Sequence, residues 1–494
     1  MTATATRQRQ AESGLARASR KAQQVMDSFP LLDYTIIRTV VLVLAGLGVV
    51  MVMSSSMATS FALSESPWSL AIRQGIMVCG GLFAFWAALK THPERLRYWS
   101  SWFMLLAVIL LFAVLIPGIG TGREEVGSQS WIVVGPLRLQ PSEVARIAIA
   151  IWGAKVLAGR DPRGLFRANN GFPAFIAVAA LCTMLIAAQG DLGMAMSFAI
   201  VVAFILLFAG VSWATIGSVA AFVAGALLIA FLSGGFRSQR FHVYFDALFG
   251  HFEDTRGVAF QSHQGFLSLA DGHLFGVGLG QSRAKWFYLP EARNDFIFAI
   301  IGEELGLWGG ALVIALFAAL AYFGLRCARR AQNQFQSLMA AALTAGVVSQ
   351  AFINIGYVVG LLPVTGIQLP MLSAGGTSAI ITLAGMGVLA SIARHEPDAI
   401  SSMQNHGRPA FDRVFGIGEP RTLQQLRDSS NPRRKAASNR QARYGTPVAG
   451  GRPVRAPEQR SSAQPARQAR PASRPSSQRS PRYYDDMHTH RRAG

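Results

Sequence analysis

Long apolar runs separated by short polar stretches fill the chain from about residue 34 to residue 393. An apolar run of about 18 residues or more is long enough to cross a hydrocarbon core of about 30 Å as a helix. The pattern therefore predicts an all-α polytopic membrane protein with about ten transmembrane helices. The expected spans are 36–57, 70–90, 98–117, 141–158, 171–188, 192–209, 212–232, 295–324, 336–361 and 374–393.

The distribution of Lys and Arg predicts how these helices are oriented. Basic residues gather in three of the connecting stretches, "LKTHPERLRYW", "AGRDPRGLFRANN" and "GLRCARRAQ". Cytoplasmic loops carry an excess of Lys and Arg, so these three stretches and both termini are expected in the cytoplasm. Two long loops then lie outside, 118–140 and, between helices 7 and 8, the large extracytoplasmic loop 233–294. Apolar and aromatic runs in the second loop predict short amphipathic helices.

Composition supports a membrane protein with polar ends. The chain is 51% hydrophobic and only 15% charged, whereas an ordinary soluble domain is about 25% charged. We expect a basic cytoplasmic segment over 1–33, a membrane domain over 34–396 and a basic cytoplasmic tail over 397–494. The tail is too polar to fold alone, so we expect disorder. Its charge favours contact with anionic lipids or, as the alternative, with a cytoplasmic protein partner. Because no aromatic stacking residues accompany the arginines, the tail predicts no nucleic-acid partner.

The stretch "YLPEARNDFIFAIIGEELG", residues 288–306, enters an expected span while carrying four carboxylates. A carboxylate at mid-membrane costs about 2.5–3.5 kcal/mol on insertion scales, so these groups are expected to face a cavity or a partner. Glu291 and Asp295 are four residues apart and share a face if the helix begins early. Glu303 would border the same cavity, or form an interhelical clasp with Glu304.

Four further residues in or near the expected outer loops each have two interpretations. Glu143 and Arg146 are three residues apart and can pair on one helix face, either as a structural pair or as part of a site. Asp191, between two glycines, either caps a helix or faces the cavity. Trp131 is either an interfacial anchor or a site residue. Composition and spacing alone leave an enzyme and a transporter equally open.

Four motifs carry a resemblance to a known family: "SWIVVGPLRLQPSE", "GDLG", "FGVGLGQSRAKWFYLPEARNDFIFAIIGEELG" and "PVTGIQLPMLSAGGTS". Together they resemble the shape, elongation, division and sporulation (SEDS) family of bacterial membrane proteins. The resemblance runs from about Tyr34 to Ala393, with the motifs in the family's order. The motifs look most like those of cell-division members, and elongation members are the close alternative.

The resemblance implies a peptidoglycan glycosyltransferase. Its substrate would be lipid II, and it would join MurNAc C1 to a GlcNAc 4-hydroxyl with inversion, releasing undecaprenyl pyrophosphate. A class B penicillin-binding protein would be its partner and would supply the transpeptidase. Both would work with other division proteins in the inner membrane, at the division septum. A lipid II flippase and a scaffold that only recruits the penicillin-binding protein are the alternatives.

The resemblance also implies roles for single residues. Asp295 matches the family's expected catalytic aspartate, Trp131 matches a tryptophan needed for activity, and Glu143 matches the acid of "QPSE" at the end of the first motif. Arg146 stands where many members have lysine, which changes the donor geometry. Arg293 stands where the family commonly has histidine, so a role for that histidine does not carry over.

The implied reaction places the base at the outer membrane surface. The acceptor's lipid tail holds it in the bilayer while its sugars stand outside, and a base must come within about 2.6–3.2 Å of the proton it takes. Asp295 fits that position. Lys285, Arg293, Arg283 or a divalent cation (Mg or Mn) would meet the pyrophosphate, although the sequence shows no ligand set. We expect no organic cofactor, and Glu303 would help to hold the cavity's shape.

Overall fold

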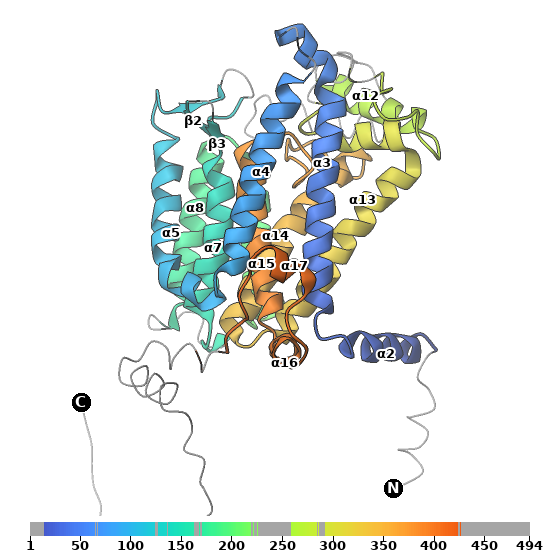
Figure 1. The fold of residues 1–494 in the computed structure, drawn as a ribbon. Helices are drawn as coiled ribbons and strands as arrows, with labels where there is room; N and C mark the ends of the chain where they lie inside the picture. The colour runs from blue at the N-terminus through green and yellow to red at the C-terminus, as the bar shows by residue number, and fades with distance from the viewer. Residues whose placement is uncertain are drawn as a thin grey trace, which may run out of the picture. The chain divides into compact units, whose positions relative to one another are not determined.

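The computed structural model describes residues 14–64, 68–123, 127–135, 137–162, 170–218, 258–283 and 292–422, with a few isolated positions between them. Figure 1 shows these residues as a helical bundle with small additions at both ends. The elements are α2 (Gly14–Asp27), α3 (Leu32–Ser64), α4 (Ser69–Lys90), α5 (Pro93–Ala113), β1 (Gly120–Thr121), β2 (Trp131–Val134), β3 (Leu137–Leu139), α7 (Pro141–Leu157), α8 (Phe172–Ala188), α9 (Leu192–Phe208), α12 (Val258–Asp271), α13 (Ile297–Arg330), α14 (Gln334–Val358), α15 (Thr377–Arg394), α16 (Pro397–His406) and α17 (Ala410–Val414).

The expected membrane spans appear as helices wherever the structure describes them. Within the described residues, six helices are long and apolar enough to cross a membrane, namely α3, α4, α5, α13, α14 and α15, while α8 and α9 are shorter apolar helices. The prediction of a multi-pass membrane protein is thus confirmed. The expected seventh span, 212–232, lies mostly outside the described residues, so the count of ten stays a prediction.

Helices α14 and α15 form the centre of the bundle. Most of their length is buried, 78% and 83% of the apolar stretch, against 22% for α5 at the periphery. α15 packs along α4, and α13 packs against α14 and α3. At the α4–α15 crossing, a Cβ at Gly387 would collide with the backbone of Phe85. Small residues of this kind let membrane helices approach closely, where van der Waals packing holds them together.

One end of the bundle, here called the loop end, carries a small sheet that the sequence did not predict. Strands β1, β2 and β3 pair in that order, antiparallel, with Ile132 opposite Leu139. They lie in the predicted outer loop 118–140. In the second long loop, α12 provides one of the expected short helices, and the apolar run at 241–252 falls outside the described residues.

The other end, here called the terminal end, gathers the three basic connections. Asn333 Nδ2, in the α13–α14 connection, donates to Glu94 at the start of α5 over 2.7 Å. Gly159 N, after α7, donates to Gln334 Oε1 over 2.6 Å. The prediction that the three basic stretches share one end is therefore confirmed.

The predicted disordered tail begins too early at residue 397. Residues 397–422 continue the fold through α16 and α17, which return to the terminal end of the bundle (Figure 1). Ile400 and Met403 are buried, and buried Asp412 pairs with Arg394 over 2.7 Å. These few apolar and acidic residues fold against the bundle although the segment's composition resembles that of the basic tail after it.

Candidate functional site

Asp295 lies in the turn 292–296 that leads into α13 at the loop end, and its side chain is half-buried. Helix α13 begins only at Ile297. The helix therefore starts after Asp295, and the early start that would have put Glu291 and Asp295 on one helical face does not occur. Glu291 itself lies outside the described residues.

The turn is tied to the segment that precedes α15 by two successive carbonyls. Arg293 O accepts a hydrogen bond from Ala374 N at 3.0 Å. Asn294 O accepts from Ser373 Oγ at 2.6 Å. Ser373 is buried, so this anchor is shielded from competing water. The segment "PVTGIQLPMLSAGG" before α15, which contains several Pro and Gly residues, therefore holds the turn in place.

The next carbonyl, that of Asp295, is held by α14. Asn354 Nδ2 lies 2.8 Å and the Tyr357 hydroxyl 2.9 Å from Asp295 O. The same two side chains also contact Ile367 O, at 2.7 and 2.8 Å. Asn354 and Tyr357 are buried, so they fix the turn and the segment before α15 against one another. These bonds go to the main-chain oxygens of Asp295 and Ile367.

Two arginines provide positive charge near the turn. Arg293, two residues before Asp295, is half-buried, and its Nη1 atom has no hydrogen-bond partner. Arg283 is exposed. An unpartnered, buried guanidinium nitrogen carries a large desolvation cost, which an anionic ligand would relieve. The sequence proposed both residues for this purpose.

Glu303 holds the loop before the site. Ser282 Oγ donates to Glu303 Oε2 at 2.7 Å, and Arg283 N donates to Glu303 Oε1 at 2.7 Å. Glu303 is 1% exposed, so hydrogen bonds from these two donors take the place of water around its carboxylate. Its carboxylate is therefore engaged in holding residues 282 and 283, which agrees with the predicted supporting role.

Glu304 and Lys285 form a second, separate anchor. Glu304 accepts from Ser54 Oγ at 2.7 and 2.6 Å and lies 3.3 Å from Lys285 Nζ. Lys285 also donates to Gly280 O. Both charged side chains are buried, and a buried pair has to stay paired because an isolated charge there is strongly destabilising. The Lys285 ammonium group is thus occupied within the fold.

A break in α13 makes room for this loop. Gly306 has φ 68° and ψ −165°, which is outside the helical region. The segment containing "GVGLG" passes so close that a Cβ at Gly306 would lie 2.6 Å from Leu274 O. Val277 N and Gly278 N donate to the carbonyls of Glu303 and Glu304, at 2.9 and 3.1 Å. The glycines of this motif serve close backbone packing.

Glu143 and Arg146 form the ion pair that their spacing in the sequence allows. Arg146 Nη2 lies 2.5 Å from Glu143 Oε2, and both residues are nearly inaccessible. Gln350 of α14 bonds to both, with Nε2 3.3 Å from Glu143 Oε1. Ser197 of α9 lies 3.5 Å from Arg146. The pair therefore joins α7, α9 and α14 near the loop end, which supports its structural interpretation.

Asp191 lies beside the small sheet, and Trp131 lies within it. Asp191 caps α9, accepting from Met194 N at 3.0 Å, and Gln140 Nε2 donates to its other oxygen at 3.0 Å. The capping interpretation is thus confirmed. Trp131 opens strand β2, where Thr121 Oγ1 donates to its carbonyl at 3.2 Å. Its indole is half-buried.

A divalent-cation site does not emerge from the described part of the chain. No group of three or more His, Cys, Asp and Glu side chains able to hold a metal occurs among those residues. Glu303 and Glu304, the first acids that follow Asp295 in sequence, are already engaged by other donors. The residues that the structure describes around the turn do not fit a protein-held metal, so the cation stays a prediction and no step is derived through it.

Comparison with known proteins supplies the family. The sequence profile of the family described as "Cell cycle protein", whose label joins FtsW, RodA and SpoVE, matches residues 34–398. This chain belongs to that family. The matched range agrees closely with the predicted membrane domain, and the SEDS resemblance is confirmed.

Individual relatives cover most of the chain. A probable peptidoglycan glycosyltransferase FtsW of Mycobacterium tuberculosis is 38% identical over 432 residues, covering 86% of this chain and 81% of that protein. Stage V sporulation protein E of Bacillus subtilis is 35% identical over 356 residues, covering 72% of this chain and 95% of that protein.

Solved structures share the fold. The rod shape determining protein RodA of Thermus thermophilus matches with a TM-score of 0.53 and 23% identity, covering 73% of this chain and 96% of that one. A chain of a peptidoglycan synthase complex that coordinates polymerization and crosslinking matches with a TM-score of 0.57 and 24% identity, covering 72% and 96%. At these identities the likeness concerns the arrangement of helices.

Proposed function

We propose that this chain is a peptidoglycan glycosyltransferase that polymerises lipid II into glycan strands. Relatives that this chain matches over more than two thirds of their length are named for that activity. The observation that carries the proposal for this chain is the turn 292–296, in which three successive carbonyls are anchored, so that the half-buried Asp295 is held in one place at the loop end. A base held in this way keeps its position through many turnovers.

The proposed reaction uses Asp295 as general base. Its carboxylate takes the proton of a GlcNAc 4-hydroxyl, whose oxygen attacks C1 of MurNAc on the face opposite the pyrophosphate. The new glycosidic bond forms as the bond from C1 to the pyrophosphate oxygen breaks, so the configuration inverts and undecaprenyl pyrophosphate leaves. The base must reach the hydroxyl within about 2.6–3.2 Å, which requires a sugar seated directly against the turn.

The leaving pyrophosphate gains negative charge as the bond breaks, and fixed positive groups stabilise it. Arg293, with its unpartnered nitrogen, and exposed Arg283 are the candidates that the structure supports. Lys285 is less suited to this role because Glu304 and a main-chain carbonyl engage its ammonium group. Trp131, half-buried at the start of β2, remains a candidate for sugar contact.

The proposed setting is the bacterial inner membrane at the division septum, with both termini in the cytoplasm and the loop end outside. We further propose a class B penicillin-binding protein as partner, in keeping with the structural neighbour from a peptidoglycan synthase complex. Elongation is the alternative setting, because the family includes RodA. The basic tail beyond the described residues is proposed to bind anionic lipids or a cytoplasmic division protein.

Asp295→Asn tests the proposal. The amide cannot accept the hydroxyl proton, so purified full-length protein is expected to lose essentially all lipid II polymerisation. The protein is expected to remain folded, since the hydrogen bonds that anchor the turn go to its main-chain oxygens. Asp271→Asn, an exposed aspartate at the end of α12, is the matched control and is expected to keep full activity.

The rival functions give different results. A flippase would show no polymerisation in either form and would lose lipid II translocation in vesicles on substitution. A scaffold would tolerate Asp295→Asn while the penicillin-binding protein still bound. Full polymerisation by the Asp295→Asn protein would refute the proposed role of this residue.

A further inference from the structure

Helix α2 has one apolar and one basic side in its sequence. At 100° per residue, Leu15, Ala18, Ala22, Val25 and Met26 occupy one arc of about 100°, while the basic positions follow one another on the other side. A helix of this pattern, with Lys and Arg opposite an apolar face, is typical of segments that lie in a membrane interface. Nothing in the proposed glycosyl transfer uses this helix.

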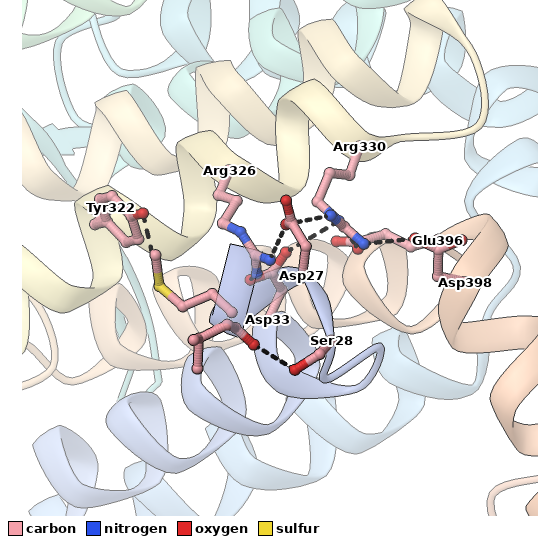
Figure 2. Close-up of polar contacts among 10 residues, drawn as sticks. Asp27, Ser28, Asp33, Tyr322, Arg326, Arg330, Glu396 and Asp398 are labelled. Atoms are coloured by element: carbon pink, nitrogen blue, oxygen red, sulfur yellow. Dashed lines mark hydrogen bonds and ion pairs between the residues drawn. The ribbon is translucent and has the colours of Figure 1, made fainter. Parts of the chain in front are cut away.

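Two ion pairs fix the end of α2 against the bundle. Asp27 Oδ1 lies 2.7 Å from Arg326 Nη2 and 2.7 Å from Arg330 Nη1, both on the last turns of α13. Figure 2 shows Asp27 between the two arginines, with Asp33 and Glu396 beside them. Because Asp27 is the last residue of α2, the pairs hold the helix close to the point where α13 ends.

The placement of α2 follows from the membrane span that succeeds it. Only a few residues separate Asp27 from the start of α3 at Leu32, the first residue of the first spanning stretch. In Figure 1, α2 lies at the level of the foot of the bundle and extends sideways away from it, roughly at right angles to α3. A helix attached so closely to the beginning of a span, and lying across it, is positioned at the membrane surface.

The contact of Met26 indicates which side of α2 faces the bilayer. The Tyr322 hydroxyl lies 3.7 Å from the Met26 sulfur. Tyr322 is partly exposed on the spanning helix α13, and it precedes Arg330 by eight residues, about 12 Å along the axis toward the middle of the bundle. Met26, which belongs to the apolar arc, therefore points along α13 toward the hydrocarbon.

Apolar side chains near Met26 are left uncovered by the protein. Val25 is 60% exposed and Phe29 is 58% exposed. On the other side, Arg20 and Lys21 are exposed as well. Apolar groups beside basic ones, at the level where a span begins, match a bilayer surface in which acyl chains adjoin negatively charged headgroups.

We propose that α2 is an interfacial helix that inserts Val25 among acyl chains, together with Phe29 of the turn that follows it, and binds anionic lipid headgroups through Arg20 and Lys21. The Asp27 ion pairs couple the lipid-bound helix to the end of α13. The ligand is thus a lipid surface of negative charge, and the site is distinct from the basic tail after residue 427.

Hydrogen–deuterium exchange of α2 in the full chain tests the proposal. The protein is placed in nanodiscs of phosphatidylcholine alone and in nanodiscs that also contain phosphatidylglycerol. Exchange of the α2 amides is expected to be about tenfold slower in the anionic discs, because each basic residue near the surface adds attraction. High salt is expected to reduce the difference. The Asp27 pairs are present in both discs, so the difference isolates the lipid.

Three variants sharpen the experiment. Arg20→Glu combined with Lys21→Glu is expected to abolish the difference between the discs, and Arg20→Lys with Lys21→Arg, which keeps both charges, is expected to preserve it. Val25→Asp is expected to speed α2 exchange in both discs. Unchanged exchange in α14 shows that each variant is folded.

Equal α2 exchange of the unmodified chain in the two discs overturns the headgroup assignment. A difference that survives the charge reversal does so too. If Val25→Asp leaves α2 exchange unchanged, the apolar side is not inserted. Protection that appears only when another protein is added points to a protein partner and also overturns the proposal.

Discussion

The position of Asp295 depends on atoms that are chemically independent of its carboxylate. Hydrogen bonds from four neighbouring residues hold the carbonyls of Arg293, Asn294 and Asp295, whereas the reaction would use the side chain. Changes to the carboxylate and changes to the anchors should therefore have different consequences. The first should abolish activity while the anchors of the turn persist, and the second should lower both activity and stability.

Tyr357→Phe separates these effects. The change removes the hydroxyl that lies 2.9 Å from Asp295 O and 2.8 Å from Ile367 O. A buried hydrogen bond contributes about 1 kcal/mol, so we expect thermal stability to fall slightly. Lipid II polymerisation by the purified protein should drop by about tenfold, because about 1.4 kcal/mol of lost positioning corresponds to that factor.

The control for this variant is Tyr322→Phe, which removes a hydroxyl from the partly exposed surface of α13. It should leave polymerisation unchanged. Full activity in Tyr357→Phe would mean that Asn354, Ser373 and Ala374 position the turn without the tyrosine hydroxyl.

Glu396, just after α15, should make stability depend on pH. Burial is the main cause that raises the pKa of the Glu396 carboxyl to about 8, and the negative charge of Asp33 is the second. Arg330 lowers the pKa by a smaller amount. Between about pH 5 and pH 8 the Glu396 carboxyl keeps its proton in the folded protein, whereas in the unfolded chain, where its pKa is about 4.5, it has lost it. The stability of the folded protein should therefore fall as the pH rises through this interval. We expect a melting temperature a few degrees lower at pH 8 than at pH 6.5.

Glu396→Gln serves as the comparison, because the amide does not titrate. Its melting temperature should change little across the same pH interval. His395 has the opposite sign, since burial lowers its pKa to about 3, and most of its effect on stability falls below its ordinary pKa of 6.5. Equal pH slopes in the two proteins would contradict the assignment to Glu396.

Sequence could predict some of these residues and not others. The Glu143–Arg146 pair and the capping by Asp191 follow from spacing within one helix, so a local pattern reveals them. Asn354 and Tyr357 are single polar residues in an apolar run, and their partners lie about sixty positions away. No local pattern encodes such contacts, which depend on how the helices pack.

At the scale of elements, hydrophobic run length predicted the long helices because the membrane imposes it. The sheet β1–β3 was not predicted, since its strands are two to four residues long and too short to show an alternating pattern. The start of α13 was also placed slightly early. The turn 292–296 remains non-helical because its carbonyls are used by other segments.

Gly306→Ala should destabilise the protein more than an alanine in a regular helix. The residue has φ 68°, and its added Cβ would press against Leu274 O. The strained backbone costs about 1–3 kcal/mol, so we expect a clear loss of thermal stability and weaker polymerisation. Gly75→Ala on α4, where a Cβ meets no atom, is the matched control, expected to be neutral. Equal melting temperatures would show that the break in α13 tolerates a side chain.

For the whole molecule, the boundary of the folded unit lies near residue 427. Composition alone put it at 397, because the average over the tail hides the few residues that fold back. Asp412 is fully buried and bonds both to Arg394 and to the Tyr34 hydroxyl. A contact between residues nearly four hundred positions apart cannot be recognised in the sequence of either segment.

Two truncations test this boundary. Removing residues 428–494 should leave the melting temperature of the detergent-solubilised protein unchanged. Removing 397–494 takes Asp412 from buried Arg394, and an uncompensated buried charge costs about 3–5 kcal/mol. The shorter protein should unfold at a much lower temperature, and equal stability of the two would contradict the role of α16 and α17.

The interruption at Gly306 changes how the longest helix fits the bilayer. From Leu307 to Arg330, α13 measures about 36 Å at 1.5 Å per residue, which already exceeds a hydrocarbon thickness of about 30 Å. The first turns of α13, with Glu303 and Glu304, can then belong to the rigid cap above the lipid. The two acids that look misplaced in a transmembrane sequence are thereby spared contact with hydrocarbon.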